Sequence, residues 1–316
     1  MKIKVILLSF LITTFLSLNF VIPQLVQEHL QAYLGDAQRT LATYGLIMNF
    51  DTIRMSYIPL KIRIDNLSIS AADRAVESER IFSTNRVEFS NWSFSEVISV
   101  VQGEMGVSDL SKMRIAVQQL EFNEKYISPK VGAALKSLGY NKLILNVVSD
   151  YKYSVATKDF LLNELSFEGF NMGKINLKFH LTDFVVPSSL EMKELAGFNE
   201  SSIKFFSVEY IDDSLVKNIK SLADKNNVQL DRYLAFSNKL EGNRDPANVA
   251  EESEITLGLQ KFVNDPHSLK LVVTPEKEIP FKDISLMMML SPAKLIESLQ
   301  PSLVINGSEI EISKGN

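Results

Sequence analysis

The feature that most constrains the fold is an alternation of apolar and polar residues that returns in strip after strip. Successive side chains of a β-strand point to opposite faces, so such a strip predicts a strand with one buried face. Ile62 and Ile64 keep this period, but one extra residue precedes Leu67, which predicts a bulge. Short polar linkers favour an antiparallel meander. The other strips are residues 86–94, 113–122, 142–155, 160–167, 174–184, 203–210 and 268–273.

Apolar residues with helical spacing lie on the N-terminal side of the alternating strips. Residues 24–45 place Val26, Leu30 and Leu34 three or four apart, which predicts an amphipathic helix. Two interpretations are open: a stalk that binds a membrane surface or a partner, and a helix packed on the first strands of its own domain. Because Arg39 is the one cation of the polar face, the second is favoured.

The residue pattern at the N-terminus predicts a membrane segment. Lys2 and Lys4 precede the uncharged, apolar run Val5–Pro23, which is long enough to cross a bilayer. The run contains no convincing signal-peptidase site, so an uncleaved anchor is favoured over a cleaved signal. The positive-inside bias then predicts a single-pass inner-membrane protein with a cytoplasmic N-terminus and a periplasmic bulk. If the signal is cleaved, we expect a protein secreted to the periplasm.

These patterns predict an α+β fold, in which an N-terminal membrane helix is followed by a curved antiparallel sheet with crossover helices and a helical C-terminal insert. Helical spacing returns at residues 212–226, 230–241 and 247–263, and the last strand is expected at 303–306. The predicted organisation is residues 1–23 as signal anchor or transmembrane helix, 24–45 as amphipathic stalk helix, 46–211 as strand-rich domain, and 212–316 as helical insert with closing strands, packed on the same sheet.

Composition excludes several functions. The net charge of -5 is spread along the chain, without the basic stripe of a nucleic-acid-binding protein. Cysteine is absent, which removes thiolate nucleophiles, Cys-ligated zinc and iron–sulfur clusters. Neither GxGxxG nor GxxxxGK[ST] occurs, so no nucleotide is expected. We therefore predict no cofactor, no nucleotide and no nucleic acid among the ligands.

The titratable residues form no catalytic or metal motif. His29, His180 and His267 are far apart in the chain and lie in no HExxH or HxH pattern. Asp212-Asp213 and Glu251-Glu252 are adjacent pairs, whose side chains do not face each other on a helix, so a shared proton is not expected. Asp212-Asp213 is better explained as a helix cap. We therefore predict no catalytic residue and no metal site, and the chain is not expected to be an enzyme.

Several segments carry a family resemblance. The body opens with Gly45, Phe50–Tyr57, Pro59-Leu60 and Ile62–Ile69. This opening resembles that of AsmA-like envelope proteins, which place a strand-rich body behind an N-terminal anchor. That resemblance implies a location in the cell envelope and a role in outer-membrane assembly or lipid handling. The chain lacks the length and the many repeats of the larger members, which argues against a membrane-to-membrane bridge. Further segments, at 138–140, 150–153, 163–167, 173–177 and 265–269, are similar to those of a group of Gram-negative exported proteins.

The leading hypothesis is a non-enzymatic, membrane-anchored envelope protein that handles an apolar partner, either lipid or a membrane protein. The alternatives are a structural or interaction subunit of an envelope complex without a ligand, and an envelope hydrolase. Alternating strands have one apolar face that must be covered. Either the chain covers this face as an ordinary core, or it leaves an apolar groove. The candidate groove residues are Leu143, Leu145, Val147, Ile175, Leu177 and Phe179.

Overall fold

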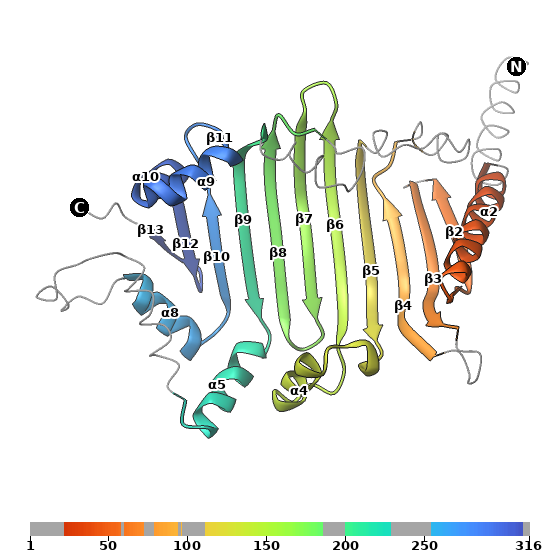
Figure 1. Ribbon diagram of the computed structural model, residues 1–316, viewed down its shortest axis with the longest axis horizontal. Coiled ribbons are helices and arrows are strands. Elements are labelled where there is room, and N and C mark those ends of the chain that lie inside the picture. Colours follow the sequence, from red (N-terminus) through yellow and green to blue (C-terminus); the bar gives the residue numbers. More distant parts are fainter. Residues whose placement is uncertain are drawn as a thin grey trace, which may run out of the picture. The chain divides into compact units, whose positions relative to one another are not determined.

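The computed structural model describes residues 22–57, 60–72, 79–93, 96, 111–185, 200–228 and 254–311. The chain divides into two compact units. The first unit consists of residues 1–127 and 144–150, and the second unit of residues 128–143 and 151–316. Neighbouring strands run in opposite directions within each unit (Figure 1).

The first unit is an antiparallel sheet with the strand order β1-β3-β4-β5. The short strands β1 and β2 pair with successive halves of β3, so together they form one interrupted edge. Residues 144–150 of β6 also belong to this unit. Its elements are α2 (Ile22–Thr43), β1 (Leu46–Asn49), β2 (Thr52–Tyr57), β3 (Leu60–Ala71), β4 (Glu79–Ser90), β5 (Lys112–Phe122) and the short helix η3 (Glu124–Tyr126), and the whole of β6 spans Ile144–Ser154.

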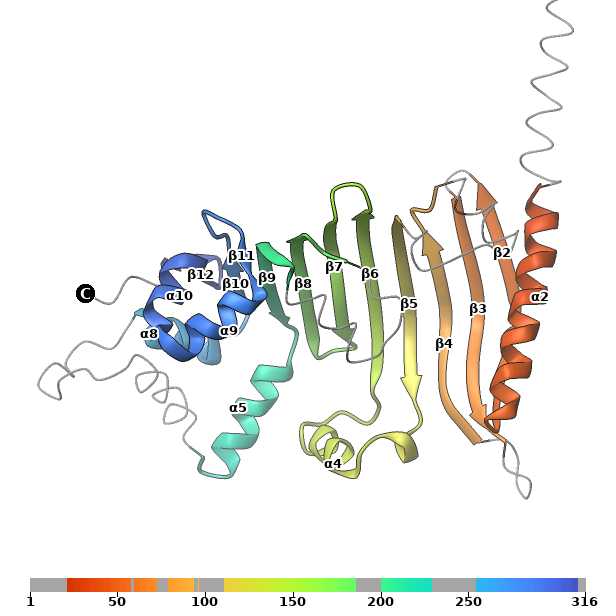
Figure 2. The ribbon, with the colours of Figure 1, turned by 45° about the horizontal axis from the view of Figure 1, so that its top comes forward.

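Helix α2 confirms the predicted amphipathic segment and packs on the strands of its own unit. It lies alongside β2 (Figure 2). Leu34 contacts the core cluster formed by Ile53 and Ile62, and the Gln38 amide donates a hydrogen bond of 2.9 Å to the Met48 carbonyl. The favoured interpretation, a helix packed on the first strands, is therefore confirmed.

The extra residue predicted in β3 is present, but it does not shift the register there. Asn66 adopts a left-handed conformation (φ 53°), and the pairs Asp65↔Arg86 and Leu67↔Thr84 on either side of it keep the same register. The neighbouring strand carries one extra residue at the same level, so the two strands stay in step. The actual register shift lies between Ile69 and Ser70.

The second unit is also antiparallel, with the strand order β7-β8-β9-β10-β12-β13 and with β11 paired to β9. Its core includes the buried residues Tyr153, Leu181 and Phe184, with Phe160 and Phe179 packed against them. Its strands are β7 (Asp159–Gly169), β8 (Gly173–Thr182), β9 (Ser202–Asp212), β10 (Ser268–Val273), β11 (Ile279–Pro280), β12 (Pro301–Ile305) and β13 (Ser308–Glu311). Its helices are α4 (Pro129–Ser137), α5 (Leu215–Lys225), α8 (Glu254–Asn264), α9 (Phe281–Leu290) and α10 (Pro292–Leu299).

The predicted fold class is wrong. The described residues form mostly antiparallel sheet with thirteen strands and few helices, rather than an α+β fold with a membrane helix and a helical insert. Residues 212–316 do contain helices, but β10, β12 and β13 continue the ladder of β9. Residues 1–21 and 230–241 lie outside the described part, as do 247–253. No described helix combines the length and apolarity needed to cross a membrane.

Candidate functional site

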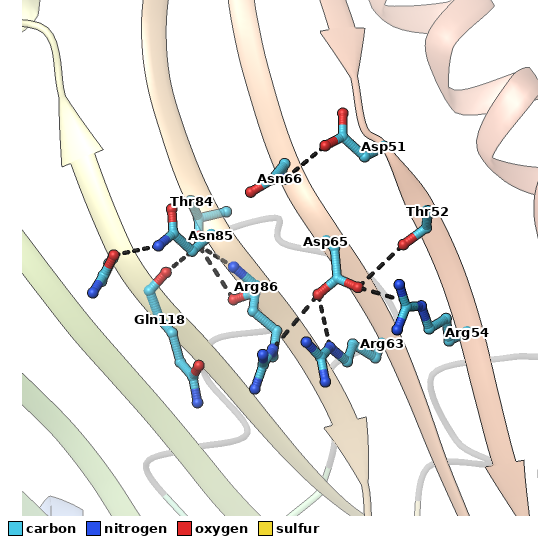
Figure 3. Close-up of polar contacts among 11 residues, drawn as sticks. Asp51, Thr52, Arg54, Arg63, Asp65, Asn66, Thr84, Asn85, Arg86 and Gln118 are labelled. Carbon is cyan, nitrogen blue, oxygen red and sulfur yellow. Dashed lines mark hydrogen bonds and ion pairs between the residues drawn. The ribbon is translucent and has the colours of Figure 1, made fainter.

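In the first unit, polar side chains lie close together at the level where the strands carry extra residues (Figure 3). We call this level of the sheet the polar crease and define it by Asp51, Asn66, Asn85 and Gln119. The Asn66 amide donates to Asp51 Oδ2 at 2.6 Å, and the Asn85 amide donates to Gln119 Oε1. Gln119, like Asn66, has a positive φ (54°), and its backbone N–H donates to Asn146 Oδ1 at 2.9 Å. Side chains thus replace ladder hydrogen bonds that the extra residues interrupt.

Beside the crease, three guanidinium groups surround one carboxylate. Arg63 Nε donates to Asp65 Oδ1 at 2.7 Å, while Arg86 Nε lies 3.6 Å from the same oxygen. Arg54 Nε lies 3.8 Å from Asp65 Oδ2, which accepts a hydrogen bond of 3.1 Å from the Thr52 hydroxyl. We call Arg54, Arg63 and Arg86 the arginine cluster. Its members come from β2, β3 and β4 and share one face of the sheet, because Arg54↔Arg63 and Asp65↔Arg86 are cross-strand partners.

The carboxylate of this group lies deeper than the cations. The Asp65 side chain is 14% exposed, while that of Arg54 is 68% exposed and those of Arg63 and Arg86 are about one-third exposed. The hydrogen bond from Arg63 holds the pKa of Asp65 below its ordinary value despite the opposing effect of burial, and Thr52 adds to the lowering. Asp65 is therefore ionised at neutral pH, and it offsets one of the three positive charges.

The same face continues with further ion pairs. Lys61 Nζ lies 2.7 Å from Glu88 Oε1, and Arg114 lies 3.6 Å from Asp150. Among these named residues of the described part, the arginine cluster, Asp65 and the two further ion pairs supply five cations and three carboxylates. It is locally positive on a chain whose net charge is -5, which favours an anionic partner for this face.

A shallow pocket of about 510 Å³ lies along the edge strand β2. Arg54 and Asp51 belong to both the pocket and the polar group described above, and Gln31 closes it from α2. The pocket is lined by Gln31, Phe50, Asp51, Thr52, Ile53, Arg54 and Met55.

The six predicted groove residues do not form one cluster within either unit. Leu145 and Val147 lie on the part of β6 that belongs to the first unit, and both are half-buried. Leu143 precedes β6 and belongs to the second unit. The remaining three, Ile175, Leu177 and Phe179, alternate along β8 of the second unit.

The residues of β8 belong to a larger apolar face, on which cross-strand partners form rows. The row Phe167–Ile175–Tyr210 crosses β7, β8 and β9. The next two rows are Leu165–Leu177–Val208 and Leu162–Phe179–Phe206. We call these nine residues the apolar rows.

Exposure of the apolar rows is uneven. Phe167 and Ile175 are cross-strand partners and are 43% and 47% exposed, whereas Leu162 is buried. Over β9 the chain covers the face itself, since Phe262 of α8 packs edge-on against Tyr210 with ring centroids 6.2 Å apart. The face is therefore ordinary core beneath α8 and at Leu162, and it is accessible at Phe167 and Ile175.

The histidines and the acidic residues of the described part form no metal-binding cluster. His180 lies 3.3 Å from Asp159, and His267 lies 3.6 Å from Asp265, so each histidine faces one carboxylate. Asp212 does cap a helix, because its Oδ1 accepts the Val216 N–H at 2.8 Å. Within the described ranges no three His, Asp or Glu side chains converge as a metal site would require. Glu251-Glu252 lies outside those ranges, and nothing is described of the His29 side chain.

Fold and surfaces together define a mostly antiparallel β protein with a cationic cluster in one unit and a partly exposed apolar face in the other. A family model described as an uncharacterized protein matches residues 166–306. None of the curated proteins compared matches the chain. The family match carries no link to AsmA-like proteins, so that resemblance stays a prediction.

The arginine cluster was not identified from the sequence. Arg63 and Asp65 alternate with Ile62 and Ile64, and this alternation by itself predicts only a strand with one buried face. The signal that was available is the recurrence of arginine at equivalent positions of neighbouring strips, but the register that aligns Arg54, Arg63 and Arg86 is decided by strand pairing.

Proposed function

We propose that this chain is a non-enzymatic protein of the cell envelope whose second unit binds the acyl chains of a lipid on the apolar rows. The observation that carries the proposal is the exposed pair Phe167 and Ile175, which lies at the end of a continuous apolar face. An exposed contiguous apolar patch on a folded unit is typical of a binding surface.

The energetics favour an aliphatic ligand. Each methylene group that leaves water contributes roughly 0.8 kcal/mol, so an acyl chain lying along several rows would be held firmly. Leu165, Leu177 and Val208 are half-buried and continue the surface inward from the exposed pair. An aliphatic chain is slender enough to follow such a row without opening the core beneath α8.

The envelope location rests on the sequence alone. Lys2 and Lys4 before the apolar run Val5–Pro23 support an inner-membrane protein with a cytoplasmic N-terminus and a periplasmic bulk, or a periplasmic protein if the run is removed. The resemblance to AsmA-like proteins supports the same location and suggests a role in envelope assembly.

The test is the lipid content of the purified full chain. We expect native mass spectrometry to find stoichiometric phospholipid on the wild type. Ile175→Asp and Leu177→Asp place a charge on the apolar rows and should remove the lipid. Lys178→Asp introduces the same residue on the opposite face of β8, where the side chain is exposed, and should leave it bound.

Two outcomes would contradict the proposal. The first is a wild-type chain that is free of lipid while it unfolds cooperatively, and the second is equal lipid content in Lys178→Asp and Ile175→Asp. In either case the apolar rows are only packing surface, and the interpretation as a structural or interaction subunit replaces lipid binding.

A further inference from the structure

We propose that the arginine cluster of the first unit is a binding site for a phosphate group (Figure 3). The ligand class is a phosphomonoester, either free in solution or as the headgroup of a lipid. The inference goes beyond the proposed function, because it requires neither an acyl chain nor the apolar rows and lies in the other unit.

The hydrogen-bonding capacity of the cluster exceeds what Asp65 uses. Each guanidinium offers five N–H donors, and a carboxylate has about four acceptor positions. One of the three arginines, Arg63, donates to Asp65 within hydrogen-bond distance. Arg86 Nε is buried without a hydrogen-bond partner, 3.6 Å from the carboxylate, and Arg54 Nε lies 3.8 Å away. A buried donor without a partner is costly, so Asp65 leaves part of the hydrogen-bonding capacity of Arg86 unsatisfied.

The depth of the charges favours an anion that approaches from solvent. Asp65 lies beneath the three guanidinium groups, so it holds them together and leaves the outer side positive. Arg63 is fixed by its hydrogen bond to Asp65, while Arg54 is mostly exposed and can move toward a ligand. One cation held in place and two with remaining donors form a preorganised anion site.

The arrangement fits phosphate better than the other common anions. A phosphomonoester carries close to two negative charges and three acceptor oxygens, which match three guanidinium groups of which one charge is already neutralised. A single carboxylate ligand would leave one guanidinium unpaired. Nucleic acid would need an extended basic stripe, whereas the cations beside the cluster, Lys61 and Arg114, already have Glu88 and Asp150 as partners.

The test measures binding to the purified full chain with two probes. Inorganic phosphate is titrated by calorimetry, and vesicles of phosphatidylcholine with or without phosphatidic acid are used in a flotation assay. The variant is the double substitution Arg54→Gln and Arg86→Gln, which leaves the hydrogen bond between Arg63 and Asp65 intact. The matched control is Arg114→Gln, which removes a cation of the same face that lies 3.6 Å from Asp150.

We expect the double variant to bind roughly tenfold more weakly or worse, the order expected when a charge-assisted hydrogen bond is lost, and the control to bind within about twofold of the wild type. Binding of inorganic phosphate would support the phosphate site, and such binding without binding to phosphatidic acid vesicles would point to a soluble phosphomonoester. Binding to phosphatidic acid vesicles alone, with the same dependence on Arg54 and Arg86, would identify a lipid headgroup. If the double variant does not fold, the exposed substitution Arg54→Gln alone provides the comparison.

The proposal is overturned if neither probe binds the folded wild type, or if the double variant and the control weaken binding equally. The cluster would then serve only to stabilise the sheet. This failure is separate from that of the proposed function, because lipid content is altered through Ile175 and phosphate binding through Arg54 and Arg86.

Discussion

Glu96 provides the sharpest stability test of the structure. Its carboxylate is buried and accepts four hydrogen bonds. Oε2 accepts from the Ser93 N–H at 2.5 Å and the Ser93 hydroxyl at 2.8 Å. Oε1 accepts from the Ser111 N–H at 2.8 Å and the Ser111 hydroxyl at 2.7 Å. The carboxylate thus joins Ser93 to Ser111, which directly precedes β5.

Glu96→Gln keeps the shape of the side chain but turns one oxygen into an NH₂ group. The serine hydroxyl on that side can rotate and accept from the new amide, whereas the backbone N–H cannot. One backbone N–H therefore loses its acceptor, and a loss of this kind costs about 1–3 kcal/mol. Because Ser111 is exposed and water reaches it, we expect a loss of about 2 kcal/mol in the free energy of unfolding. This corresponds to roughly 1 M in the urea midpoint.

Trp92 is the assay. It is the single tryptophan of the chain, precedes Ser93 and packs on the cluster of Ile53 and Ile62, so its fluorescence reports the first unit. Urea unfolding of wild type and Glu96→Gln at pH 7 should give different midpoints with equal slopes.

The pH dependence adds a second criterion. Burial alone would raise the pKa of Glu96, but the hydrogen bonds from Ser93 and Ser111 outweigh burial and hold it below the ordinary 4.5. A lowered folded-state pKa stabilises the protein above the unfolded value, and this contribution is lost as the pH falls through the folded value. The difference between wild type and variant should therefore shrink below about pH 4.5. Equal midpoints at pH 7, or a difference that is constant down to pH 3, would refute this account.

Two further predictions concern the turn between β7 and β8 and the location of the chain. Gly173 has φ 145°, and a Cβ there would lie 2.5 Å from the Ile211 carbonyl, so Gly173→Ala should lower the free energy of unfolding by about 2 kcal/mol or more in a thermal melt. Gly132→Ala in α4 meets nothing within 4 Å and should leave stability equal or raise it by up to about 1 kcal/mol, and a similar loss in both variants would contradict the steric argument. An alkaline phosphatase fused after Asn316 should be active, whereas a stable but inactive fusion would reverse the proposed orientation.

Local patterns predicted local structure well. Ser93 and Glu96 are three residues apart and exchange reciprocal hydrogen bonds, with Glu96 N 3.3 Å from Ser93 Oγ, and this spacing is visible in the sequence. The alternating strip at 268–273 is β10 to the residue, and the helical spacing before residue 45 is α2. These features depend on neighbours within a few residues, and such neighbours are visible in a sequence.

Pairing between distant strands was not predictable in the same way. The extra residue before Leu67 was visible, but whether it shifts the register depends on whether the facing strand carries one too. The candidate groove residues alternate as predicted on β8, yet Leu145 and Val147 belong to the other unit. A period of two shows that a strand has an apolar face, but it does not show which strand lies beside it or which helix covers it.

The amino-acid sequence by itself determined that this chain builds alternating strands with short turns, because side-chain periodicity and turn chemistry are local properties. Only the tertiary structure decided that Arg54, Arg63 and Arg86 meet around Asp65, since cross-strand register places them on one face. It likewise decided that α8 covers Tyr210 and leaves Phe167 and Ile175 exposed. Both surfaces arise from contacts between residues far apart in the chain, and the free energy of such contacts depends on the packed whole rather than on any one segment.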